Sequence, residues 1–262
     1  MVKSELNEIH LPYPLRGEKR VWVYVPKLGG EKLPVIYMTD GQNLFDSGST
    51  PYGCWDVVKA VENEICGGFG GAVIVGIDNS GDYRDSELTP NSIGKVLHRD
   101  MLNENFEPEG EIFDAFLMNT VIPYVEENFP VKTGGSNRAI CGSSSGGLQA
   151  FFEGVENKDE FAAVGALSPA FLLYSEDDWK NYLATKINKD LPYLYIYSGA
   201  QDELENMIFQ SVEMLYDLLL CAGYSCDKIN EVVLLENGHN ERAWKEIFGD
   251  FLHTCLCRVF NL

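Results

Sequence analysis

The chain has 262 residues, of which 45% are hydrophobic and 23% are charged, and this composition excludes a disordered or fibrous protein. We expect one globular domain over residues 1–262. The formal net charge of -20 repels phosphate backbones and anionic membranes, so it argues against nucleic-acid and membrane partners.

No window of the sequence approaches the 18 consecutive apolar residues that a membrane-spanning helix needs. The first 30 residues lack the apolar segment of a signal peptide, so we expect a soluble, cytoplasmic protein. The seven cysteines lie mostly in apolar runs without the paired spacing of a zinc site, which favours reduced thiols and no metal. We expect no cofactor, and the sequence is compatible with a homo-oligomer without specifying one.

Short apolar runs alternate with turns and helical patterns along the chain. This alternation predicts an α/β fold with a mostly parallel central sheet, flanked by helices on both faces. The first run alternates polar and apolar residues, as an antiparallel edge strand does. The predicted strands cover 19–26, 34–40, 72–78, 137–142, 162–168, 193–199 and 231–237. Apolar stripes at helical spacing cover 111–129, 206–223 and 242–260.

The stretch CGSSSGG over 141–147 is the strongest chemical signal in the sequence. It fits the pattern G-x-S-x-G only with Ser144 at the centre, between a predicted strand and a predicted helix. Such a tight turn holds the central hydroxyl up at the start of the helix, as a nucleophile requires. A simple helix cap is the alternative interpretation. We therefore predict Ser144 as the nucleophile.

A serine nucleophile needs a histidine to accept its proton and a carboxylate to orient that histidine. Of the four histidines, His239 follows the last predicted strand, at the carboxyl end of the sheet where such sites assemble. The acid is expected after the preceding strand, where the sequence AQDELEN offers several carboxylates. We predict Asp202 as the acid because it comes first after the turn, and Glu205 is the alternative.

Attack on an ester builds negative charge on the carbonyl oxygen, which two backbone N–H groups must stabilise. One is expected from Ser145, the residue after the nucleophile. The other is expected from the loop after strand 34–40, where Gly41 permits close approach and Gln42 supplies the amide. An ordinary Asp-Gly turn is the alternative for that loop.

Five ordered motifs, VIYMTDGQNLFD, GIDNSGDYRDSELTP, CGSSSGG, YSGAQDE and ENGHNERAW, resemble the putative esterase family of α/β-hydrolases. That family includes feruloyl and acetylxylan esterases, enterochelin-type siderophore esterases and esterase D. The resemblance spans roughly residues 15–260 and implies an α/β-hydrolase fold. By position it implies Ser144, Asp202 and His239 as the triad. Unlike many secreted members, this chain has Asp40-Gly41 where they carry His-Gly.

The resemblance implies a carboxylic ester hydrolase that acts through an acyl-enzyme. We expect acetyl or hydroxycinnamoyl esters of plant carbohydrate fragments as substrates. Aromatic residues and one cation are candidates for binding them, although core packing is the alternative for each aromatic. These substrate-binding candidates are Phe45, Trp55, Arg84, Phe171 and Trp179. A siderophore esterase, an acyltransferase and an inactive binding protein of the same fold are the alternative functions.

Overall fold

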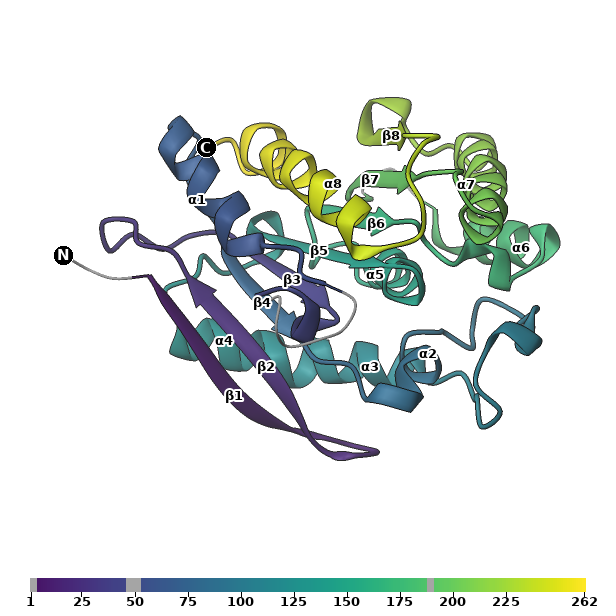
Figure 1. Ribbon diagram of the computed structural model, residues 1–262, viewed down its shortest axis with the longest axis horizontal. Helices are drawn as coiled ribbons and strands as arrows, with labels where there is room; N and C mark the ends of the chain where they lie inside the picture. The colour runs from purple at the N-terminus through teal and green to yellow at the C-terminus, as the bar shows by residue number, and fades with distance from the viewer. Residues whose placement is uncertain (1–3, 46–52, 188–190) are drawn as a thin grey trace.

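The computed structural model describes residues 4–45, 53–187 and 191–262, and these form a three-layered α/β arrangement (Figure 1). Its centre is an eight-stranded sheet with the strand order β1-β2-β4-β3-β5-β6-β7-β8. Among the described strands, the pairs β1–β2 and β2–β4 are antiparallel, and all other pairs are parallel. The predicted, mostly parallel α/β sheet is confirmed. The strands are β1 (Glu5–Tyr13), β2 (Gly17–Val25), β3 (Val35–Thr39), β4 (Val73–Ile77), β5 (Arg138–Ser143), β6 (Ala163–Leu167), β7 (Tyr193–Ser198) and β8 (Ile229–Val233).

Helices cover both faces of the sheet, as predicted, and each face has its own apolar core. Helices α1 and α8 pack on one face, where α8 contributes Phe248 and Phe251. The other face is covered by α3, α4, α5, α6 and α7, with Phe113 and Phe151 among its fully buried residues. The helices are α1 (Val57–Gly67), α2 (Arg84–Glu87), α3 (Gly110–Phe116), α4 (Ile122–Asn128), α5 (Ser145–Glu156), α6 (Glu176–Lys186), α7 (Glu203–Cys221) and α8 (Glu241–Thr254).

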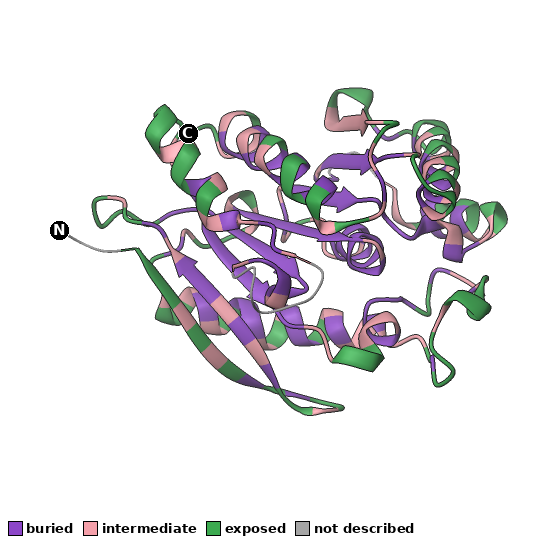
Figure 2. Cartoon of the chain, in the orientation of Figure 1, coloured by how far each residue is buried: buried purple, intermediate pink, exposed green. Residues whose placement is uncertain are grey.

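The edge of the sheet differs from the prediction. The expected edge strand, β2, is flanked by β4 and by an additional strand, β1, which pairs with it along its whole length. Much of β1 is exposed, whereas the central strands are buried (Figure 2). A mostly exposed strand has no continuous apolar run, and this is why the sequence pattern did not reveal it.

Parallel strands place their carboxyl ends along one edge of the sheet, and the loops that follow them meet there. The loops after β3, β5, β7 and β8 carry the predicted catalytic and oxyanion residues, and the segment after β4 carries Arg84. All seven cysteines are free thiols in the structure; Cys54, Cys141 and Cys255 are buried as expected, whereas Cys66, Cys221 and Cys226 are exposed. No helix among the described residues is long and apolar enough to span a bilayer.

Candidate active site

Ser144 lies in the sharp turn between β5 and α5, with φ 58° and ψ -125°. This backbone conformation costs energy for a residue with a side chain, and such strain is often concentrated at functional sites. Close contacts leave no room for a side chain at the glycines on either side of this turn, Gly142 and Gly146. A Cβ atom on Gly146 would lie 2.2 Å from Thr39 Oγ1, and one on Gly142 would lie 2.4 Å from the Gly146 carbonyl oxygen. The strand-turn-helix arrangement expected around Ser144 is therefore present.

His239 brings its ring to this serine from the loop between β8 and α8. Its Nε2 atom lies 3.0 Å from Ser144 Oγ, within hydrogen-bonding distance. The Trp244 ring packs edge-on against the imidazole, with 5.0 Å between centroids and an interplanar angle of 90°. The half-buried histidine is thus held on one side by an indole and on the other by polar contacts.

Glu205 is the carboxylate that meets the other ring nitrogen. Its Oε2 atom lies 2.7 Å from His239 Nδ1, and the side chain has no solvent exposure. The second oxygen, Oε1, accepts hydrogen bonds from the Gly199 amide at 2.7 Å and from the Ser168 hydroxyl at 2.6 Å. The Trp244 indole donates in turn to Ser168 Oγ at 2.9 Å. These bonds fix the carboxylate in one orientation.

The prediction that Asp202 contacts the histidine ring is wrong. Asp202 is the N-cap of α7, and its Oδ1 accepts the Glu205 amide at 2.8 Å. Its Oδ2 accepts the backbone amide of His239 at 2.9 Å, so Asp202 positions the histidine loop instead. Burial raises the pKa of Asp202, but hydrogen bonds from these two amides outweigh burial and leave its pKa below the usual value. Glu205 lies in the first turn of the helix and points toward the ring.

The two predicted oxyanion-hole residues flank this serine. Ser145 is the first residue of α5, and an N–H group at that position has no acceptor within the helix. Gln42 lies in a short 3-10 turn after β3 and lines the same cleft as Ser144. Asp40 begins that turn in the left-handed region at φ 57°. A Cβ atom on Gly41 would lie 2.6 Å from the Gly76 backbone, which accounts for the glycine at that position.

A model of the family described as Putative esterase matches residues 14–213. The chain belongs to this family. It is a carboxylic ester hydrolase, as expected from the sequence motifs. Its overall structure is similar to a ferulic acid esterase, with a TM-score of 0.69 and 19% identity, covering 99% of this chain and 100% of the other.

Two further solved structures share the fold of this esterase. The enterobactin esterase of Shigella flexneri has a TM-score of 0.72 at 19% identity, covering 97% of this chain and 59% of the other. A siderophore hydrolase of Aspergillus nidulans has a TM-score of 0.73 at 19% identity, covering 98% and 94%. At such identities the likeness establishes the α/β-hydrolase fold, and it does not establish a shared substrate.

Most of the aromatic residues predicted to bind substrate lie elsewhere in the esterase. Phe171, in the turn before α6, and Trp179, on α6, are fully buried and pack against Phe151. Trp55 is 3% exposed and packs against Trp244 and Phe248 in the core of the opposite face. The substrate-binding prediction is wrong for these three because each ring is enclosed by other side chains.

Phe45 is half-buried and contacts Trp22, with 6.2 Å between the ring centroids. Phe45 is not among the described residues that line the cleft. Of the five predicted substrate-binding residues, only Arg84 lines the cleft. Its guanidinium forms a bidentate ion pair with the Asp40 carboxylate, with nitrogen-oxygen distances of 2.7 and 2.8 Å.

The cleft above Ser144 has a volume of about 550 Å³, and most of its lining residues are of polar or acidic type. Burial raises the pKa of Glu241 above its usual value, and the nearby Asp40 carboxylate raises it further. Neither Asp82 nor Glu241 forms an ion pair with another described residue, although the charges of Arg84 and His239 partly offset the rise in the pKa of Glu241. The wall is formed by Asp40, Gln42, Asn43, Asn79, Gly81, Asp82, Arg84, Asp85, Asn103, Ser143, Ser144, His239, Glu241 and Trp244.

Sequence reasoning missed the supporting residues of this site. Ser168 and Trp244 secure Glu205, while Asp85 accepts the Ser145 hydroxyl at 2.9 Å. Ser168 directly follows the buried strand β6 and has a φ of 41°, and this positive φ at a non-glycine residue is visible only in the structure. Trp244 stands in the quoted motif ENGHNERAW, and its position five residues after the histidine could have suggested contact with the ring.

Proposed function

We propose that the esterase is a serine hydrolase in which Ser144 attacks the ester carbonyl and forms an acyl-enzyme. The observation that carries this proposal is the continuous contact from Ser144 Oγ through the His239 ring to Glu205, with distances of 3.0 and 2.7 Å. In this mechanism the imidazole takes the hydroxyl proton during attack and gives it to the departing alcohol. Glu205 keeps the ring oriented and stabilises its positive charge.

The same residues can complete the second half of the reaction. Water replaces the alcohol in the cleft, His239 removes a proton from it, and the resulting attack releases the acid and regenerates Ser144. Both steps place negative charge on the carbonyl oxygen. The amides of Gln42 and Ser145 stabilise that charge in the proposed mechanism, and no metal is needed to polarise the ester.

The wall of the cleft favours an acyl ester of a neutral carbohydrate fragment. Carboxylate and carboxamide side chains hydrogen-bond to hydroxyl groups, and Asn79, Asn103, Asp82 and Glu241 supply such groups around Ser144. Trp244 is the one large aromatic residue in the described lining. We therefore favour a short acyl group such as acetyl over hydroxycinnamoyl, which would use an aromatic platform.

An anionic siderophore ester is the less suitable substrate for this cleft. A ferric tris-catecholate carries negative charge, while Asp82, Asp85 and Glu241 line the wall and Arg84 is already paired with Asp40. The negative charges of the bound siderophore and of these carboxylates would repel each other, and a partly enclosed site screens this repulsion less than bulk water does.

The decisive experiment measures hydrolysis of p-nitrophenyl acetate by the wild type and by Ser144→Ala. We expect the variant to lose a factor of about 10³ or more in kcat. Ser136→Ala, an exposed serine at the opposite end of β5, serves as the matched control and should retain full activity. Equal rates in wild type and Ser144→Ala would overturn the proposed nucleophile.

A substrate panel then tests the proposed class. Acetylated xylo-oligosaccharide should give a higher kcat/KM than methyl ferulate, and both should exceed a ferric catecholate trilactone. Preference for the trilactone would favour a siderophore esterase. Transfer of the acetyl group to an added sugar, in place of release of acetate, would identify an acyltransferase.

A further inference from the structure

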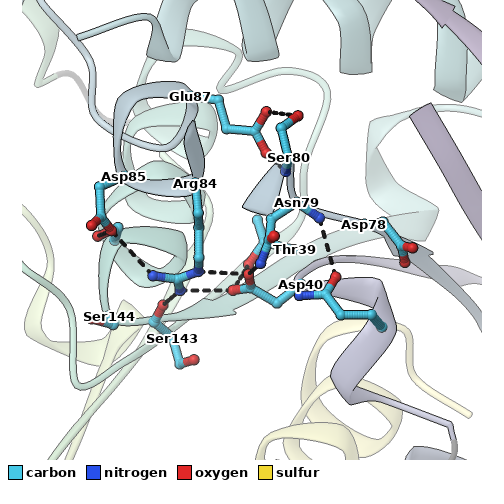
Figure 3. A network of polar contacts seen from close by, with 12 residues as sticks. Thr39, Asp40, Asp78, Asn79, Ser80, Arg84, Asp85, Glu87, Ser143 and Ser144 are labelled. Atoms are coloured by element: carbon cyan, nitrogen blue, oxygen red, sulfur yellow. Dashed lines mark hydrogen bonds and ion pairs between the residues drawn. The ribbon is translucent and has the colours of Figure 1, made fainter. Parts of the chain in front are cut away.

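Arg84 joins two loops that carry opposite sides of the active site (Figure 3). Its Nε and Nη2 atoms donate to the two carboxylate oxygens of Asp40, at 2.7 and 2.8 Å. The same Nη2 atom donates to the Ser143 carbonyl oxygen at 3.1 Å. Asp40 lies two residues before Gln42, and Ser143 immediately precedes the nucleophile. One guanidinium therefore connects the loop after β3 to the end of β5.

The next residue of α2 holds the nucleophile turn at a second point. The Ser145 hydroxyl donates to Asp85 Oδ1 at 2.9 Å, and Arg84 Nη1 lies 3.4 Å from the same carboxylate oxygen. Ser145 is also the residue whose amide belongs to the proposed oxyanion hole. Consequently, α2 contacts both segments that carry the proposed hole through two consecutive side chains: Arg84 binds Asp40, two residues before Gln42, and Asp85 binds Ser145.

A buried ion pair fixes α2 to the sheet at its other end. The Glu87 carboxylate is fully buried and accepts Lys19 Nζ at 3.0 and 2.9 Å. It also accepts the amide and the hydroxyl of Ser80, at 2.9 and 2.6 Å. Because Lys19 belongs to β2, these bonds tie the segment that carries Arg84 to the antiparallel part of the sheet.

The positive charge of Arg84 is compensated within the protein by the carboxylate of Asp40. Burial raises the pKa of the Asp40 carboxyl, but the guanidinium and the hydrogen bonds from Asn79 and Thr39 outweigh burial and leave that pKa below its usual value. Asp40 is thus an ionised, buried group that depends on Arg84 for compensation. A substrate anion would have to compete with this bidentate pair, which argues against the predicted substrate-binding role of Arg84.

We propose that Arg84 is a positioning residue that, with Asp40 and Asp85, sets the separation between the Gln42 and Ser145 amides. This inference rests on the proposed serine esterase mechanism. Both amides must point at one oxygen atom from about 2.7–3.1 Å, so a small change in their separation weakens at least one bond. A misplacement of about 1 Å in such a site can reduce the rate by about 10²-fold.

The main test compares Arg84→Lys with Arg138→Lys on p-nitrophenyl acetate. Lysine keeps the charge but loses the planar fork that contacts Asp40 and Ser143 together. We expect Arg84→Lys to lower kcat by about 10–100-fold, with KM changed by less than about threefold. Arg138 is a matched control because it is buried and pairs with Glu126 and Glu160 at the far end of β5. Its variant should retain the wild-type kcat.

Two further measurements separate positioning from general loss of structure. Affinity for a trifluoromethyl ketone, which forms a charged tetrahedral adduct with the serine, should fall in parallel with kcat/KM. Added guanidinium should restore part of the activity of Arg84→Ala. Asp85→Ala removes, from a partly exposed position, the hydrogen bond from Ser145 and the longer contact to Arg84 Nη1, and it should lower kcat by up to about tenfold with the same signature.

The possible outcomes distinguish this inference from the proposed function. If the wild type hydrolyses no ester, the proposed mechanism fails, and the inference fails with it. If the wild type is active but Arg84→Lys retains its kcat, only the inference is overturned. A rise in KM confined to carbohydrate esters, with p-nitrophenyl acetate unaffected, would instead make Arg84 a substrate-binding residue.

Discussion

The two acidic residues near His239 show how a single helical turn separates different roles. Asp202 caps the helix and binds two backbone amides, whereas Glu205 reaches the ring. A short side chain at an N-cap folds back onto the helix start, where an N-cap bond contributes about 1 kcal/mol to stability. The longer glutamate, inside the first turn, can extend away from the helix to the imidazole.

This division of roles predicts different kinetics for two conservative variants. Glu205→Gln should lower kcat by about 10²–10⁴-fold with little change in KM, because the amide no longer stabilises the imidazolium. Asp202→Asn should lower kcat by less than about tenfold, since asparagine also caps helices well. Steady-state kinetics on p-nitrophenyl acetate measure both. A larger loss in Asp202→Asn than in Glu205→Gln would reverse the assignment of the acid.

At the scale of elements, β8 and α7 meet through a group of carboxylates. Burial, together with repulsion from Glu213 and Asp217 on α7, raises the pKa of Glu231 on β8 to about 7. The folded protein therefore holds this proton more tightly than the unfolded chain does. The contribution of the protonated group to stability is complete below the unfolded pKa of about 4.3, and it is lost as the pH rises toward 7.

Replacing this residue should consequently change stability in a pH-dependent way. Glu231→Gln removes the charge, so we expect its Tm to exceed that of the wild type by roughly 2–4 °C at pH 8 and to match it at pH 4.5. The modest size reflects the partial exposure of the group. Glu236→Gln, on an exposed turn, is the control and should behave as wild type. Thermal unfolding would contradict the prediction if the Glu231→Gln difference were the same at both pH values.

At the scale of the whole molecule, the net charge of -20 and the acidic cleft act in the same direction. Each repels an approaching anion, and dissolved salt weakens this repulsion by shortening the range of the field from about 30 Å at 0.01 M to about 3 Å at 1 M. Neutral esters are not subject to this effect.

Ionic strength should therefore separate charged from neutral substrates. We expect kcat/KM for p-nitrophenyl hemisuccinate, which carries a carboxylate, to rise by about 2–10-fold from low to high salt. The value for p-nitrophenyl acetate should stay constant and serves as the internal control. A fall in the hemisuccinate value with salt would indicate a cationic surface at the cleft.

The sequence by itself determined the positions of the buried strands along the chain, the nucleophile turn and the position of His239 after the last strand. These features depend on local constraints, namely continuous apolar runs and glycines such as Gly142 and Gly146 that only a tight turn requires. They can be recognised from a few neighbouring residues.

Only the tertiary structure decided which carboxylate meets the imidazole, which aromatic rings are enclosed and what Arg84 binds. Each of these depends on the direction of a side chain and on partners far away in the chain: Glu205 meets His239, Phe151 covers Trp179, and Asp40 occupies Arg84. Composition and spacing specify which residues follow a strand, but packing between layers determines where their side chains point.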